Sequence, residues 1–79
     1  MPLYFFDIID GEDLPDRFGS QHADLKAARV EAIRYSGEVL REMPERFWNA
    51  EEWKMTVSDG SRTPLFTLKF FAEPLPGPS

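Results

Sequence analysis

The sequence contains no cysteine. Disulfide bonds and thiolate–metal sites are therefore excluded, and the lack of thiols is compatible with the reducing cytoplasm, where we expect this protein to act. No apolar run approaches the ~20 residues that a transmembrane helix requires. We also expect no secretory signal, because Met1–Ile9 has no basic segment and acidic residues follow it directly.

Basic residues are few. The chain has 9 lysines and arginines against 14 aspartates and glutamates, which gives a net charge of −5. Nucleic-acid phosphates would be repelled by such a surface, so we expect no binding to nucleic acid. The charge favours solubility or a basic partner.

The length of 79 residues predicts one domain. A single core of this size supplies only ~3–5 kcal/mol of stability unless something reinforces it. Aromatic residues make up 14% of the chain, and each large ring buries much area. A dimer interface would also help. We assign residues 1–73 to a small α+β domain and the proline-rich residues 74–79 to a disordered tail.

Asp24–Met43 is predicted to be one long amphipathic helix. Asp24 suits the N-cap, because its carboxylate accepts from free N–H groups of the first turn. Pro44 ends the helix, since its ring disfavours helical geometry at Met43. Gly37 and the small residues around it make the helix thin, which indicates close helix–sheet packing or contact with a second protomer. Apolar residues spaced by three and four form the expected buried stripe: Leu25, Ala28, Ala32, Tyr35, Val39 and Met43.

Three further segments read as strands because their side chains alternate. These are Leu3–Ile9, Trp53–Ser58 and Leu65–Phe71, and the last two are joined by an Asp59-Gly60 turn into a hairpin. A short edge strand is expected around Asp16–Phe18, and the segment from Glu45 to Glu52 is expected to be a connector.

The simplest assembly is a single β-β-α-β-β layer, an antiparallel sheet of three to four strands packed on one long helix. One face of the sheet would meet the helix stripe through eight apolar residues: Tyr4, Phe6, Ile8, Met55, Val57, Phe66, Leu68 and Phe70. The opposite face would keep large apolar groups of its own, over which Phe47 and Trp48 could fold. If Phe47 and Trp48 do not cover that face, its exposed apolar side chains should bind a partner, most simply a second copy of the chain.

Several short motifs occur together: Tyr4-Phe5-Phe6-Asp7, an Ala28-Arg29…Glu31-Ala32 helix start and the Pro64–Leu68 run, after a strand opened by Trp53. The set resembles a family of short bacterial domains of unknown function and covers Met1 to about Ala72. The resemblance implies a bacterial stand-alone domain and carries no assigned activity. A likeness at the level of architecture alone links the chain to HicB-type antitoxins, although two strands follow the helix here rather than one.

Candidate chemistry is sparse. The densest acidic run is Asp7, Asp10, Glu12, Asp13 and Asp16, which indicates either a solvated turn or a site for a hard cation. Its spacing does not match an EF-hand loop. His22 is the only histidine and is expected at the surface, without partners for nucleophilic catalysis. We therefore predict no catalytic, cofactor or metal site, and no enzyme.

The leading hypothesis is a non-enzymatic protein-interaction module that forms a homodimer. The alternatives are an antitoxin-like regulatory partner of a basic protein and a domain that binds a metal or small molecule. Phe47 and Trp48 are adjacent aromatics, which more often anchor a core or an interface than a ligand. The predicted interaction surface comprises Leu3, Phe5, Phe47, Trp48, Leu65 and Phe71.

Overall fold

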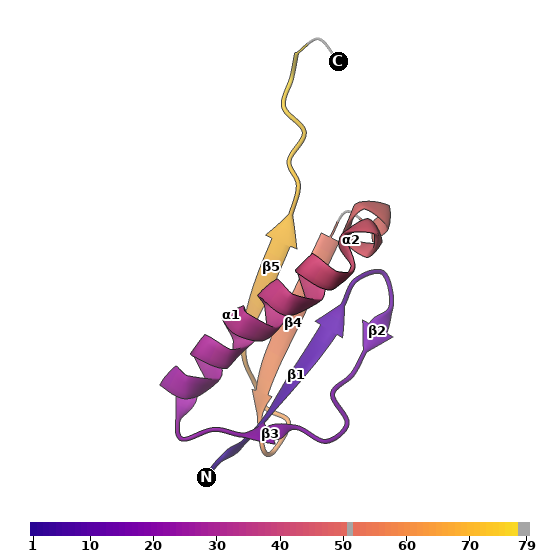
Figure 1. The fold of residues 1–79 in the computed structure, drawn as a ribbon. Helices are drawn as coiled ribbons and strands as arrows, with labels where there is room; N and C mark the ends of the chain where they lie inside the picture. Colours follow the sequence, from indigo (N-terminus) through magenta and orange to yellow (C-terminus); the bar gives the residue numbers. More distant parts are fainter. Residues whose placement is uncertain (51, 78–79) are drawn as a thin grey trace.

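The computed structural model describes residues 1–50 and 52–77. Five strands form one antiparallel sheet in the order β2-β1-β4-β5, with β3 also paired to β1. Helix α1 crosses one face of this sheet (Figure 1). The fold is therefore α+β as predicted, with five strands rather than three to four and two helices rather than one. The elements are β1 (Leu3–Ile9), β2 (Asp13–Leu14), β3 (Ser20–Gln21), α1 (Leu25–Glu42), α2 (Pro44–Ala50), β4 (Glu52–Asp59) and β5 (Pro64–Phe71).

The long helix is confirmed to within one residue at each end. The Asp24 carboxylate accepts a hydrogen bond of 2.8 Å from the Ala27 N–H, as an N-cap does. The helix ends at Glu42, with Met43 as its C-cap immediately before Pro44. Local signals in the sequence thus fix both ends of α1.

The buried stripe of α1 differs in part from the predicted one. Ala28, Ala32 and Ser36 are its buried residues, whereas Tyr35 and Met43 are 37% and 38% exposed. The Ser36 hydroxyl donates to the Ala32 carbonyl oxygen over 2.6 Å. Burial costs this side chain little because its polar atom is satisfied within the helix.

Gly37 takes no part in close helix–sheet packing. A Cβ at this position would meet no heavy atom within 4 Å. The helix approaches the sheet through alanine and serine, and the expectation that Gly37 contributes to that contact is wrong.

Most of the connector expected from Glu45 to Glu52 belongs to a second helix, α2. Pro44 is the first residue of α2, a position where its missing N–H would have no partner anyway. Phe47 is 4% exposed and belongs to the core, which explains why this short helix docks. Glu51, the next to last residue of the expected connector, lies outside the described residues.

The core lies between α1 and the face of the sheet that carries even-numbered β1 residues. Met55 and Val57 of β4 are fully buried, and they stand opposite Ile8 and Phe6 of β1. Trp53 is also buried at 2% exposure, and its indole N–H has no hydrogen-bond partner among the described residues. The predicted sheet-to-helix contact is confirmed except at its outer corner, where Phe70 of β5 is 50% exposed.

The segment between β1 and α1 departs most from expectation. The predicted edge strand at Asp16–Phe18 is wrong: two strands of two residues flank this stretch instead. Leu14 pairs with Ile8 at one end of β1, and Ser20 pairs with Tyr4 at the other. Residues 74–77 of the predicted tail are exposed and belong to no helix or strand, and residues 78–79 lie outside the described part.

Candidate functional site

The outer edge of β5 is the longest unpaired strand edge in the described residues. β5 has eight residues, pairs only with β4, and ends the strand order of the sheet. Figure 1 shows no strand on the side of β5 that faces away from β4. The backbone N–H and C=O groups on that side therefore have no sheet partner, which makes the edge a template for another strand.

Large apolar side chains gather on and beside this edge. Phe71 is 67% exposed, Phe70 50% and Leu65 41%, and Trp48 of α2 is 62% exposed. Trp48 and Phe70 line one groove of about 250 Å³ together with three neighbours from α1 and α2, namely Leu40, Pro44 and Phe47. We name Leu65, Phe70, Phe71 and Trp48 the β5 patch.

Three of the six predicted surface residues lie in the β5 patch, and three do not. Leu65, Phe71 and Trp48 are exposed, as an interaction surface requires. Leu3 is half-buried. Phe5 and Phe47 are 8% and 4% exposed, so neither is available to a partner.

Phe47 packs on the helix side of the sheet, against the ring of Phe70 at a centroid distance of 5.0 Å, and not over the back face. Trp48 stacks edge-on against Phe47 at 5.2 Å and stays near the same groove. The idea that these two aromatics cover the back face is therefore wrong. Phe70 is not among the predicted surface residues, because the alternation of side chains in β5 predicts that Phe70 lies in the core.

Phe5 is covered by a residue from the far end of the sequence. The Arg62 guanidinium carbon lies 3.7 Å from the centre of the Phe5 ring, a cation–π contact. The same guanidinium contacts the Asp7 carboxylate at 3.3 Å and donates to the Asp16 carbonyl oxygen at 2.7 Å. The Phe5 ring is thereby covered and removed from the candidate surface, whereas Ile9 on the same face of β1 is 40% exposed.

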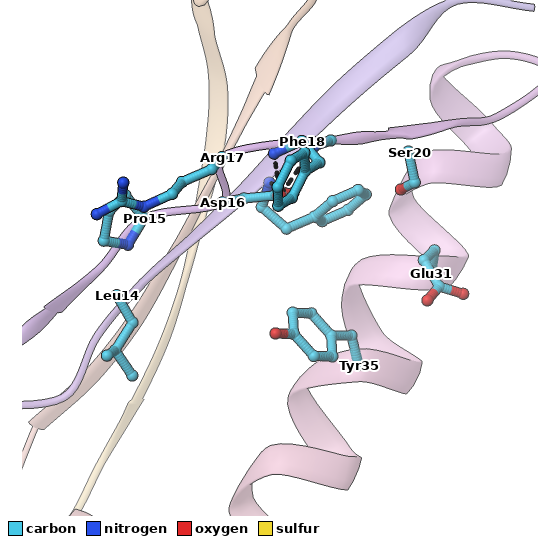
Figure 2. Close-up of a pocket in the computed structure, with 10 residues that line it drawn as sticks. Leu14, Pro15, Asp16, Arg17, Phe18, Ser20, Glu31 and Tyr35 are labelled. Carbon is cyan, nitrogen blue, oxygen red and sulfur yellow. Dashed lines mark hydrogen bonds between the residues drawn. The ribbon is translucent and has the colours of Figure 1, made fainter.

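Asp16 is the centre of the opposite, closed edge of the sheet. Its carboxylate accepts hydrogen bonds from the N–H groups of Phe6, Phe18 and Gly19, at 3.1, 3.2 and 2.9 Å (Figure 2). Its own N–H donates to the Asp7 carboxylate at 2.7 Å. The prediction of a solvated turn is wrong for Asp7 and Asp16, which hold the edge together, whereas Glu12 and Asp13 of the same acidic run are exposed.

A cleft of about 480 Å³ lies between α1 and this closed edge, lined among others by Tyr35, Glu31 and Phe18 (Figure 2). Its two acidic side chains, Asp16 and Glu31, already have partners within the chain. The Asp16 oxygens accept backbone N–H groups, and Glu31 pairs with Arg34 at 3.4 Å. A ligand would thus find neither carboxylate free, although small-molecule sites normally provide several convergent polar groups.

Asp10 is the one strongly buried carboxylate among the described residues, with 3% of its side chain exposed. Arg46 of α2 contacts it at 2.9 Å and reaches Glu12 at 3.4 Å. The hydrogen bond and charge of Asp10 raise the pKa of Arg46 above its ordinary value, and Glu12 adds to this. A raised cation pKa stabilises the fold at every pH below the ordinary value, so the Arg46 guanidinium adds no pH dependence near neutrality.

His22 is not the free surface histidine that the sequence predicts. Its ring is half-buried and packs edge-on against Phe6 with centroids 5.6 Å apart. Its Nε2 lies 2.9 Å from the Ser20 hydroxyl. The residue therefore belongs to the packing around β3.

The described residues contain no group of three or more histidine or acidic side chains arranged to hold a metal ion. Neither described helix has both the length and the apolar character needed to cross a membrane.

Comparison with known proteins identifies a family for this chain but no individual relative. Neither the curated proteins nor the solved structures include a match to this chain. A family model does match, over residues 3–72, which include every strand and both helices. Its description assigns no activity, which agrees with the predicted resemblance to a family of domains of unknown function. The chain belongs to the family described as Domain of unknown function (DUF6894).

Proposed function

We propose that this chain is a non-enzymatic protein-interaction module of the cytoplasm that forms a homodimer through β5. The observation that carries the proposal is the open outer edge of β5, eight residues long and bordered by exposed apolar side chains. Native proteins usually shorten, charge or cover such an edge. An edge left open and apolar is typical of a surface that another chain covers.

The two faces of β5 both supply apolar area. Phe70 lies on the helix side of the sheet, because it stands opposite Trp53, while Phe71 stands opposite Glu52 and lies on the back. Leu65 lies at the irregular step of β5, between Pro64, which pairs with Ser58, and Phe66, which pairs with Val57. Trp48 extends the surface along α2. Aromatic side chains of this kind are enriched where proteins contact each other.

The polar residues support an interaction role better than a catalytic one. Asp7, Asp10 and Asp16 are all engaged in hydrogen bonds or ion pairs within the chain. This use of the carboxylates also leaves less acidic surface for a basic partner, so the antitoxin-like alternative has weaker support.

The test is the mass of the protein in solution, measured by light scattering and sedimentation over a range of micromolar concentrations. A concentration-dependent dimer is expected. Phe71→Thr should weaken the dimer about tenfold or more, because each subunit loses an aromatic ring from the interface. Threonine keeps the β-propensity of the strand.

Phe18→Thr is the matched control. Phe18 is 87% exposed and lies at the closed edge of the sheet, where the proposal places no partner. Its replacement should leave association unchanged. A chain that stays monomeric at every concentration, or a Phe18 variant that weakens association as much as the Phe71 variant, would refute the proposal.

A further inference from the structure

We propose that a second copy docks its own β5 antiparallel to this β5, about a two-fold axis that passes beside Leu68. The two sheets of five strands would then join into one continuous sheet. This inference rests on the proposed homodimer and adds the register of the contact, which follows from the sequence of β5 and its pairing with β4.

Symmetry limits the registers that are available. A two-fold axis perpendicular to the sheet makes the two copies of β5 antiparallel and keeps both copies of α1 on the same face. Residues that stand opposite each other then point to the same face, so one residue must stand opposite its own copy. The two-fold axis must therefore pass beside one of a few residues in the middle of β5.

Charge excludes the register centred on Lys69. Lys69 already stands opposite Lys54 of β4 on the back face of the sheet. Pairing Lys69 with its own copy would place four lysines in one row across the dimer. Like charges directly opposite each other are destabilising.

The register centred on Leu68 separates these lysines and matches the apolar groups. Lys69 then stands opposite Thr67 of the second copy. On the helix side, Phe66 faces Phe70. At the end of the paired segment, Leu65 comes opposite Phe71; Leu65 is the extra residue at the irregular step where Phe66 pairs with Val57 and Pro64 with Ser58. The exposed apolar residues of β5 would thus cover one another in pairs across the axis.

The register centred on Thr67 matches less well. It places Lys69 opposite Leu65 and leaves Phe71 beyond the paired strands, opposite Thr63. It also places Pro64 opposite Phe70, where proline offers no N–H to the ladder. The Leu68 register therefore uses more of the exposed apolar surface and more of the backbone.

Strand pairing by itself gives a small interface, and stable complexes bury about 800 Å² on each partner. The flank of α1 near β5 supplies further apolar area. Leu40 lines the groove with Phe70, and Ile33 lies two helical turns earlier on the same flank, 63% exposed. With both helices on one face of the joined sheet, these flanks face each other across the axis.

The register is tested by two substitutions of opposite charge at one exposed position. Thr67 lies on the back face, and its hydroxyl bonds only that of Thr56, at 3.2 Å. In the Leu68 register, Thr67→Glu places a carboxylate opposite each Lys69 and should tighten the dimer about 2- to 30-fold at low salt, measured by sedimentation. Thr67→Lys should weaken it by a similar factor.

Thr67→Gln is the neutral reference, because all three variants lose the same hydroxyl contact. Opposite effects of Glu and Lys support the Leu68 register. Weakening by both would mean that Thr67 stands opposite its own copy, which overturns the register but not the dimer. Equal affinities for all three variants would place the interface away from β5 and overturn the inference.

Cross-linking gives a second readout, which is clean because the chain has no cysteine of its own. Mild oxidation of mixed Thr67→Cys and Lys69→Cys proteins should yield a disulfide between the two variants, since opposite residues lie within disulfide range. Either variant alone should cross-link far less. Preferential self-linking of Thr67→Cys or Lys69→Cys would contradict the register, whereas a wild-type chain that never dimerises would refute the proposed function itself.

Discussion

The two edges of the sheet are treated in opposite ways. At the β1 edge, β2 and β3 each pair with one end of the strand, and the Asp16 carboxylate accepts the Phe6 N–H between them. At the β5 edge, the eight-residue strand pairs with β4 on one side and with no described strand on the other, and Phe71 is 67% exposed. One edge is closed by the residues that connect β1 to α1, and the other is left open.

The β1 edge is closed by specific side chains of the loop beside it, and not by the loop backbone alone. The loop at the β1 edge has only two short strands, and a carboxylate with three backbone donors fills the gap between them. Arg62 adds a bond to the Asp16 carbonyl oxygen and covers Phe5. The β5 edge has no equivalent among the described residues, and this difference is the reason that we propose it as an interface.

The largest expected effect is the loss of the closed edge in Asp16→Ala. The substitution removes the acceptor of three N–H groups, and hydrogen bonds to a charged group are among the stronger ones, so we expect a loss of about 3 kcal/mol in the free energy of unfolding. Chemical denaturation measures this loss. Asp13→Ala is the control: Asp13 is exposed in β2, and a change within about 0.5 kcal/mol is expected. Equal losses in the two variants would contradict the role of Asp16.

Gly19→Ala tests the same edge through the backbone. Gly19 has φ +70°, and an added Cβ would lie 2.8 Å from the Tyr4 carbonyl oxygen. Both the strained backbone and the clash oppose alanine, so we expect a loss of about 2 kcal/mol in thermal or chemical unfolding. At Gly60, in the turn beside the open strand, a Cβ would meet its nearest atoms at an ordinary 3.7 Å. Gly60→Ala should therefore be tolerated, and a loss there as large as at Gly19 would argue against the close approach.

Local signals explain why some elements were predictable and others were not. Asp24 and Pro44 bound the long helix, and the alternation around Asp59-Gly60 predicts the hairpin, because these features depend on near neighbours. The two short strands flank a hydrogen bond that the Phe6 N–H donates to the Asp16 carboxylate, ten residues away. The second helix depends on where Phe47 docks. Such features follow from tertiary contacts, which spacing along the chain does not reveal.

The candidate site was predictable only in part for the same reason. Alternation assigns Phe71 correctly to the back of β5, but it does not reveal the break in the pairing with β4 at which Leu65 lies. It cannot show that Arg62 covers Phe5, since those residues are far apart in sequence. Nor can it show that Phe70 stays half exposed, because this depends on where α1 and α2 end over the sheet.

The adjacent residues Phe70 and Phe71 sharpen the contrast at the open edge. Phe70 packs against Phe47, whereas Phe71 points to the back face and is two-thirds exposed. Phe70→Thr should lower the unfolding free energy of the monomer by about 1–2 kcal/mol, since half of the ring is buried. Phe71→Thr should change it by less than about 0.5 kcal/mol. Unfolding is measured at concentrations where the chain is monomeric. A large loss in the Phe71 variant would mean that this ring serves the fold rather than a partner.

The smallest expected effect is a gain in stability, in Gly37→Ala. A Cβ at Gly37 enters open space, and alanine is favoured over glycine inside a helix, so we expect the unfolding free energy to rise by about 0.5–1 kcal/mol. The same substitution should therefore have opposite signs at Gly37 and at Gly19. It also separates two possible interfaces: if β5 joins the copies, the variant dimerises as well as the wild type. A more stable monomer with weakened dimerisation would instead place the small-residue surface of α1 in the contact, as the sequence alone allows.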